Sequence, residues 1–320
     1  MIKYVVKRFA QMIVVLFIVS LLVFLLTNFI GDPVDMLVPE NATLEQIESA
    51  RARLGLDKPL PVQYGIFIRD VLHGNFGKSY IYGKPAMDLI FERMPATLEL
   101  VAVAACLVLC IAIPLGVYAG AYPKRASSSY YVRFYFRYFS SFLLGRHDDD
   151  LHFCSCLRLL PASGRGNTVM VGNVALSIFA PGGIRYVILP AITLALTNVA
   201  TMLRLTRSGI LENMRQDYIK FARAKGVPAK SILFGHALKN ALIPVVTIFG
   251  MDLGNMIAFT TITETIFAWP GMGKLLIDAI NKSDRPIIVA YLMAAACMFV
   301  VLNFIVDILY TLIDPRIELR

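Results

Sequence analysis

Long apolar runs are the feature that most constrains what this 320-residue chain can fold into. A helix needs about 20 predominantly apolar residues to cross the hydrocarbon core of a bilayer. Runs that approach or exceed this length predict spans at about residues 9–30, 98–121, 186–203, 241–262 and 287–312. Because backbone polar groups in lipid must be paired within the segment, each span is expected to be a helix. The sequence therefore predicts an all-α, polytopic membrane protein.

Basic residues beside these runs predict the orientation of the chain. Lys3, Lys7 and Arg8 precede the first run, and Lys and Arg are dense between Arg204 and Lys239. Cytoplasmic loops carry such an excess of Lys and Arg, which explains the net charge of +9 better than nucleic-acid binding does. The first run is too long for a signal peptide and lacks an A-x-A-like cleavage site. We therefore predict a first membrane anchor with a cytoplasmic N-terminus.

The stretch 217–244, DYIKFARAKGVPAKSILFGHALKNALIP, lies between two apolar runs but is not loop-like in composition. Tyr218, Phe221 and Ala222 recur at helical spacing, and basic residues occupy the other side. Gly226 and Pro228 then break the helix, and a second helical stretch is predicted from about 231 to 242. Such a compact knob is suited to filling a groove on a soluble partner.

This stretch resembles the cytoplasmic coupling loop of binding-protein-dependent ABC importer permeases of the peptide-importer branch. The resemblance is carried by residues 221–226 (FARAKG), residues 236–240 (HALKN) and Pro244; residues 220–222 (KFA) stand where the general family form opens with Glu-Ala-Ala. It implies a coupling loop at about 208–240. The residues implied in coupling to an ATPase are Asp217, Tyr218, Phe221, Ala222, Arg223, Ala224, Lys225, Gly226 and His236.

Further motifs extend the resemblance over nearly the whole chain outside about residues 126–158. They are LGLDKP at 54–59, GNFGKS at 74–79 with Asn75 in place of the usual aspartate, LPASGRG at 160–166, ETIFAWPGMG at 264–273 and DPR at 314–316. Thr43 and Gln46 also resemble a capping box that opens a helix to about Leu54. The resemblance implies six transmembrane helices of the ABC importer permease type, with an extracytoplasmic segment after the first.

The expected organisation has three parts. Residues 1–95 form the N-terminal anchor and the extracytoplasmic segment, residues 96–313 form the permease transmembrane domain, and residues 314–320 form a cytoplasmic tail. With six spans, both termini are expected in the cytoplasm.

Polar side chains inside the apolar runs are candidates for a translocation path. Charges at membrane depth are costly and usually face a cavity or a partner helix. Asp252 and Asn255 lie in the run 241–262, and Asn303 lies in the run 287–312. Asp252 is the deepest and is the first candidate. The alternative is an interhelical hydrogen bond without a role in transport.

Motifs for catalysis are absent from the sequence. It contains no Walker A, G-x-S-x-G or H-E-x-x-H pattern, so we expect no enzyme activity and no cofactor in this chain. The five cysteines show no spaced framework. Residues 147–152 (HDDDLH) look like metal ligands, but we predict no metal site, because the stretch that contains them is itself anomalous.

The resemblance implies a permease subunit that imports di- or oligopeptides across a bacterial inner membrane. Its implied partners are a second permease in a heterodimer, two ATP-binding cassette subunits that bind the ATP, a periplasmic or extracellular peptide-binding protein, and membrane lipid, with no nucleic acid. Nickel or glutathione import by the same machinery remains open. A proton-driven secondary transporter, in which Asp252 cycles a proton, is the alternative from another class.

Residues 126–158 conflict with the third span that the topology requires. Asp and Arg near a span centre each cost about 2.5–3.5 kcal/mol, so the four charges between Arg146 and Asp150 cost on the order of 10 kcal/mol. Aspartates written GAT-GAT-GAT read as ATG-ATG one base out of phase. A shifted back-translation of 141–152 can give the apolar P-(F/S)-F-W-V-G-M-M-M-I-F. We interpret the stretch as frameshifted; codons at Asp148–Asp150 that are not apolar in the other frame would refute this.

Overall fold

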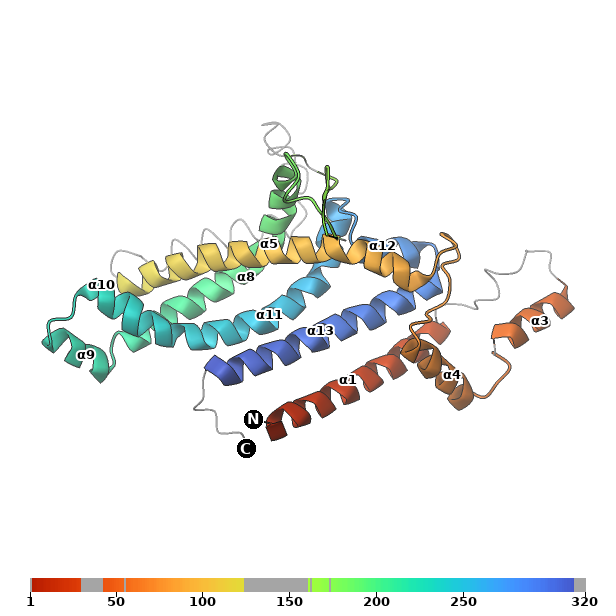
Figure 1. The fold of residues 1–320 in the computed structure, drawn as a ribbon, viewed down its shortest axis with the longest axis horizontal. Coiled ribbons are helices and arrows are strands. Elements are labelled where there is room, and N and C mark those ends of the chain that lie inside the picture. Colours follow the sequence, from red (N-terminus) through yellow and green to blue (C-terminus); the bar gives the residue numbers. More distant parts are fainter. Residues whose placement is uncertain are drawn as a thin grey trace. The chain divides into compact units, whose positions relative to one another are not determined.

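The computed structural model describes residues 2–29, 43–54, 56–123, 161, 163–172 and 174–313. Figure 1 shows the helices and strands along the chain. The chain divides into two compact units. The first unit comprises Met1–Thr97 and Pro270–Phe304, and the second comprises Leu98–Trp269 and Ile305–Arg320. Each unit is described by itself.

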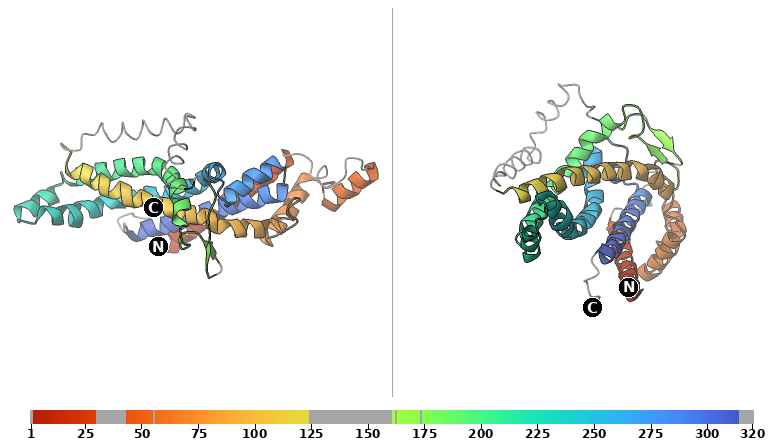
Figure 2. Two further views of the ribbon diagram at one scale, coloured as in Figure 1. Left: turned by 90° about the horizontal axis from the view of Figure 1, so that it is seen from above. Right: turned by 60° about the vertical axis from the view of Figure 1, so that its left-hand side comes forward.

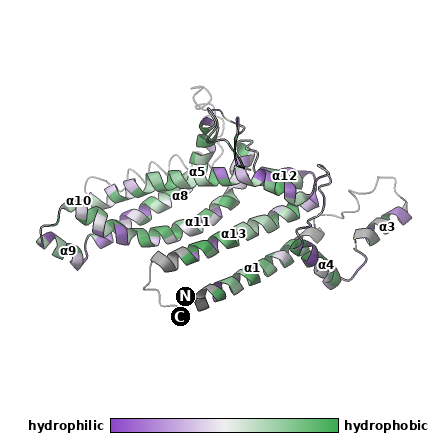
Figure 3. Ribbon diagram, in the orientation of Figure 1, coloured by the Kyte–Doolittle hydropathy of each residue, from purple (hydrophilic) through white to green (hydrophobic). Residues whose placement is uncertain are grey.

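Among the described residues, five helices are long and apolar enough to cross a membrane. They contain the candidate spans Val6–Leu26, Ala86–Ala121, Ile184–Asn213, Ala229–Ile266 and Arg285–Ile308. Figure 3 shows hydrophobic residues along most of their length. The prediction of a polytopic, mostly helical membrane protein is confirmed. The third span, expected within the stretch 126–158 that we interpret as frameshifted, lies outside the described residues and stays a prediction.

The first unit contains α1 (Ile2–Phe29), α3 (Leu44–Leu54), α4 (Leu60–Leu72), the start of α5 (Ala86–Ala121), α12 (Met272–Asn281) and most of α13 (Arg285–Ile313). Helix α3 begins where the capping pattern predicts, since the Thr43 N–H donates to Gln46 Oε1 over 3.1 Å. Helix α4 packs on α1 through Phe24, whose ring centroid lies 5.3 Å from that of Tyr64 and 5.7 Å from that of Phe67. These aromatic contacts join the anchor helix to the segment that follows it.

A buried aspartate joins the GNFGKS segment to the turn between α12 and α13. Asp284 Oδ2 accepts a hydrogen bond from Ser79 Oγ over 2.5 Å, and Asp284 Oδ1 accepts from the Tyr80 N–H over 3.3 Å. Burial is the main cause that raises the pKa of the Tyr80 hydroxyl above its usual value. The start of α5, α12 and α13 share the hydrophobic core beneath this segment, which includes Ile90, Leu275 and Ile287.

The second unit contains the remainder of α5, β1 (Val169–Val171), β2 (Val174–Leu176), α8 (Ile184–Asn213), α9 (Asp217–Ala224), α10 (Ala229–Ser231), the π-helical turn η1 (Ile232–Ala237) and α11 (Leu238–Ile266). The strands form an antiparallel hairpin in which Val169 pairs with Leu176 and Val171 pairs with Val174. Figure 2 shows this hairpin standing apart from α8 and α11.

The hairpin corrects the all-α prediction. Val169 and Val171 alternate in β1 and pair with Leu176 and Val174 of β2, and Gly172 has φ +63°, a conformation that glycine adopts without a Cβ clash. Val-Met-Val followed by Gly-Asn is a short hairpin signal, and it lies outside the long apolar runs from which the all-α fold was predicted.

Three spans are longer than their apolar runs predict. Helix α5 begins at Ala86 rather than near Leu98 and continues through Pro95, because its first turns are held in the core of the first unit. Helix α8 continues to Asn213. The predicted second stretch of the knob, 231–242, is continuous with the next span, and helix extends from Ala229 to Ile266.

Two glycines allow α5 and α8 to approach closely. A Cβ on Gly116 would lie 2.6 Å from Thr206 Cβ, and a Cβ on Gly120 would lie 2.7 Å from Ile210 Cβ. Small residues four apart let helix backbones pack closely in membranes, where dispersion contacts supply much of the association energy. The pair therefore fixes the spacing of these two spans.

We predict that Gly120→Ala destabilises the protein, because the added methyl group overpacks the contact with Ile210. Overpacking of this kind costs about 1–3 kcal/mol. Thermal unfolding of the full chain in detergent measures the effect. Gly65→Ala is the matched control, because Gly65 is also helical and has no atom within 4 Å of the added Cβ. Equal melting temperatures for the two variants would contradict the packing assignment.

Candidate functional site

The knob predicted from the sequence is present between the last residue of α8 and the start of α11 (Figure 1). Helix α9 carries one fully buried side chain, Ile219, which packs into a small hydrophobic core. We call this the knob core, and its buried members are Val117, Ile210, Ile219, Ile232, Ala237 and Ala241. Because they come from α5, α8, α9, η1 and α11, the short helix is seated on three spans.

The π-helical turn η1 explains how two residues reach the knob core together. Ile232 and Ala237 are five residues apart, and both are buried there. In an α-helix such residues lie about 140° apart around the axis, because each residue turns by about 100°. A π-turn has more residues per turn and brings them toward one face. Ala241 follows four residues later at ordinary α-helical spacing.

Gly226 ends α9 in a Schellman motif. Its φ is +78°, its N–H donates to Arg223 O over 3.0 Å, and the Val227 N–H donates to Ala222 O over 3.2 Å. Val227 and Ala222 both pack against the knob core, which is the hydrophobic contact that accompanies such a motif. The sequence correctly placed a helix end at this glycine.

The other predicted coupling residues line the outside of the knob. Phe221 is 62% exposed, and Lys225 Nζ lies 4.5 Å from the centroid of its ring. Asp217 and Lys220 form an exposed ion pair over 2.8 Å, in which the hydrogen bond from Lys220 lowers the pKa of Asp217. The remaining members Tyr218, Arg223, Ala224 and His236 are exposed, whereas Ala222 is half-buried.

A hollow of about 530 Å³ opens beside the start of α9. It is lined by Ser208, Leu211, Glu212, Arg215, Gln216 and Asp217. These residues come from the end of α8, the link to α9 and the first residue of α9. The lining carries both signs of charge, so the hollow is suited to polar side chains of a partner protein.

The predicted path residues lie on two helices. Asp252 is half-buried in α11, and its Oδ2 atom has no hydrogen-bond partner among the residues that the structure describes. Asn255 follows one turn later on the same side of the helix and is exposed. Asn303, in the first unit, donates from its side chain to Phe299 O over 2.9 Å, so its amide is bonded within its own helix. Asp252 thus remains the strongest candidate of the three.

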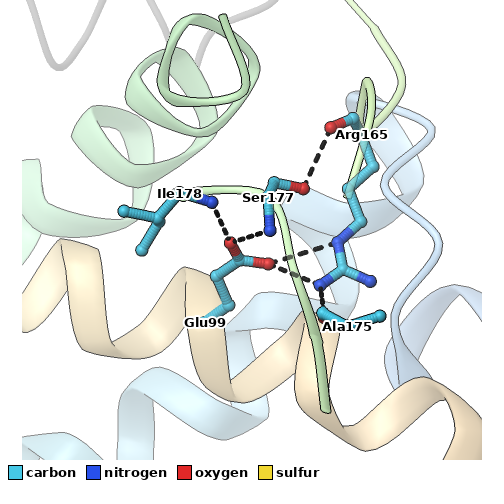
Figure 4. Close-up of polar contacts among 5 residues, drawn as sticks. All are labelled: Glu99, Arg165, Ala175, Ser177 and Ile178. Atoms are coloured by element: carbon cyan, nitrogen blue, oxygen red, sulfur yellow. Dashed lines mark hydrogen bonds and ion pairs between the residues drawn. The ribbon is translucent and has the colours of Figure 1, made fainter. Parts of the chain in front are cut away.

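A buried ion pair that the sequence analysis missed holds the β-hairpin (Figure 4). The Glu99 side chain is 0% exposed, and its Oε2 accepts from Arg165 Nη2 over 2.5 Å. Its other oxygen accepts from the backbone N–H groups of Ser177 and Ile178 over 2.6 and 2.7 Å. A buried carboxylate needs such complete pairing, because an unpaired charge is costly away from water.

Arg165 extends this network to the end of α11. Its guanidinium lies 5.6 Å from the centroid of Trp269, and the neighbouring Gly164 N–H donates to Phe267 O over 2.9 Å. Arg165 therefore joins three segments: the one before β1, the residues after β2 and the ETIFAWPGMG motif. Glu99 lies within the predicted span 98–121. A charged residue at such a position indicates a buried partner, so the sequence did contain a signal for this ion pair.

Comparison with known families matches nearly the whole chain. Residues 112–319 match the family described as "Binding-protein-dependent transport system inner membrane component". Residues 1–101 match the family described as "Binding-prot-dependent transport system membrane comp, N-term". These matches include both the knob and the segment after the first helix.

Curated relatives are similar over nearly their full length. The dipeptide transport system permease protein DppB of Alkalihalophilus pseudofirmus is 35% identical over 341 residues, covering 99% of this chain and 100% of the relative. The oligopeptide transport system permease protein AppB of Bacillus subtilis is 35% identical over 333 residues, covering 99% and 100%. The probable D,D-dipeptide transport system permease protein DdpB of Escherichia coli is 35% identical, covering 93% and 92%.

We predict that Glu99→Gln destabilises the protein by about 3–5 kcal/mol, since it leaves Arg165, whose side chain is only 12% exposed, without its charge partner. Chemical unfolding of the full chain in detergent measures the loss. The matched control is Glu92→Gln in the exposed pair with Lys84, where the side chains are 55% and 58% exposed. That variant is expected to lose less than about 1 kcal/mol. Equal losses for the two variants would refute the assignment of Glu99 as a structural anchor.

Proposed function

Because this chain belongs to the family of binding-protein-dependent transport system inner membrane components, we propose that it is a membrane-spanning subunit of an ATP-driven peptide importer. It would have no ATPase site of its own. The chain would work beside a second, related permease, two ATP-binding cassette subunits and a peptide-binding protein outside the membrane.

The observation that carries this proposal is the geometry of α9. A short basic helix with an exposed Phe221 is held by a buried Ile219 between the two membrane helices α8 and α11. An exposed aromatic side chain surrounded by basic groups is suited to a groove on a soluble protein. The neighbouring hollow lined by Glu212 and Asp217 offers polar groups to the same partner.

The proposed mechanism moves the knob as one body. ATP binding closes the two ATPase subunits, and their surfaces grip α9. Because Ile219 is packed in the knob core, displacement of α9 is expected to tilt the spans that share this core. The cavity between the permeases then opens outward to accept peptide, and hydrolysis resets it. The ligand thus biases a two-state element at a distance.

The proposed orientation places the knob and both termini in the cytoplasm of a bacterial cell, with the chain in the inner membrane. The density of Lys and Arg from Arg204 to Lys239 supports this side for the knob. Six spans follow if a third span lies within 126–158. Residues 1–95 then form the anchor and extracytoplasmic segment, residues 96–313 the permease domain and residues 314–320 a cytoplasmic tail.

A peptide is the proposed substrate because the similar permeases bear the names of dipeptide and oligopeptide systems. Nickel or glutathione import by the same machinery is the alternative within this class. Proton-driven transport would use an acid that cycles its proton, for which Asp252 is the candidate. The seated coupling helix favours the ATP-driven assembly, since a secondary transporter has no ATPase to engage it.

We predict that Gly226→Leu inserts into the membrane but abolishes ATP-driven uptake. A Cβ at φ +78° strains the Schellman motif that ends α9, although no atom lies within 4 Å of the added group. The helix end then shifts without a steric clash elsewhere. Uptake of labelled peptide into proteoliposomes with the full complex measures this. Gly74→Leu, also at positive φ in open space, is the control for backbone strain at a glycine that does not belong to the knob. Normal uptake by Gly226→Leu would remove the coupling role.

We also predict that Asp252→Leu impairs transport while assembly with the ATPase subunits stays intact, because the side chain lines the proposed path. Uptake and co-purification of the ATPase subunits are measured on the same preparation. Loss of the complex itself would show that Asp252 has a structural role, in which it bonds a neighbouring helix.

A further inference from the structure

Asn240 belongs to the HALKN motif, yet the proposed function gives it no role. Its side-chain amide donates from Nδ2 to the hydroxyl oxygen of Tyr218 over 3.0 Å. The same hydroxyl donates to Asn213 Oδ1 over 2.8 Å. One phenolic oxygen therefore joins the last residue of α8, the second residue of α9 and the start of α11. We call these three residues the Tyr218 clamp.

The hydrogen bond between Asn213 and Gly209 determines the direction of the bonds in the clamp. Asn213 Nδ2 donates to Gly209 O over 2.8 Å, so the atom that faces Tyr218 is the amide oxygen Oδ1, which can only accept. The Tyr218 proton must therefore point to Asn213, and its lone pair faces the Asn240 amide. A hydroxyl that donates once and accepts once has its orientation fixed by both neighbours.

The clamp and the knob core hold α9 in different ways. Ile219 packs without a preferred direction, since hydrophobic contacts are not directional. The clamp adds directional bonds to both flanking spans at the helix start. Tyr218 is 39% exposed, so water competes for these bonds and the clamp is weak enough to open. Packing therefore seats the helix, and the clamp sets its angle to α8 and α11.

We propose that Asn213 and Asn240 are positioning residues for the coupling helix, which act through the Tyr218 hydroxyl so that α8 and α11 follow α9 together. This inference rests on the proposed function. Without the clamp, α9 still docks on the ATPase and ATP is still hydrolysed. Part of the displacement of α9 then becomes rotation of this helix about Ile219, and α8 and α11 move less.

The test compares Tyr218→Phe, Asn240→Ala and the double variant in the full complex in proteoliposomes. Each single variant should lower the number of peptides taken up per ATP hydrolysed by about three- to tenfold, the range of one modest hydrogen bond. The double variant should lose no more than Tyr218→Phe alone, because hydroxyl and amide act as one pair.

Asn213→Asp keeps the acceptor for Tyr218 and should transport better than Asn213→Leu.

Hydrogen exchange of the full chain supplies a readout that is independent of transport. Amides of α9 should exchange faster in Tyr218→Phe than in the wild type, since the start of the helix opens more often. Tyr118→Phe is the matched control, because it removes a half-exposed tyrosine hydroxyl from α5 for which the described residues show no bond. It should leave both readouts unchanged.

The outcomes separate the clamp from the proposed function. If Tyr218→Phe matches Tyr118→Phe in both readouts while the wild type transports, the clamp is refuted and the importer stands. Faster exchange with unchanged peptides per ATP also refutes it, because the hydroxyl then has only a structural role. A wild-type complex that hydrolyses ATP without taking up peptide removes the proposed function and this inference with it.

Discussion

A hydrocarbon layer offers no hydrogen-bond partners, and the described parts of this chain follow from that constraint. The spans are helices, so their backbone groups are paired internally. The irregular segments at the helix ends need partners from elsewhere, and a buried acid supplies them in each unit. Glu99 accepts from two backbone N–H groups beside the β-hairpin. Asp284 accepts from Ser79 and from the N–H of Tyr80. The two carboxylates thus hold non-helical chain against helices.

The knob between α8 and α11 is likewise held by a few buried side chains. Only Ile219 of α9 is fully buried, yet five other buried residues from the neighbouring elements surround it. The π-turn η1 lets Ile232 and Ala237 join that core without interrupting the helix that continues into α11. A rigid seat of this kind leaves the outer surface of α9 free for a partner. In the proposed mechanism, displacement of that surface is transmitted through the packed side chains of the knob core.

The amino-acid sequence predicted what depends on composition and local chemistry, such as the apolar runs, the cap at Thr43 and the helix end at Gly226. It missed contacts between distant residues. Glu99 and Arg165 are far apart along the chain, and no periodicity relates them. The early start of α5 and the continuous helix from Ala229 also depend on tertiary packing, which overrides local breaking signals such as Pro95. The coupling and path residues stay predictions, since no bound partner or substrate tests them.

The central claim is that ATP hydrolysis by partner subunits drives import through this chain. Uptake of labelled peptide into proteoliposomes that contain the full complex and the binding protein tests it most directly, with vanadate and a protonophore added in separate reactions. The account predicts uptake that requires ATP, stops with vanadate and persists with the protonophore. Uptake that persists with vanadate but collapses with the protonophore would contradict it, and would point to proton-driven transport with Asp252 as the cycling acid.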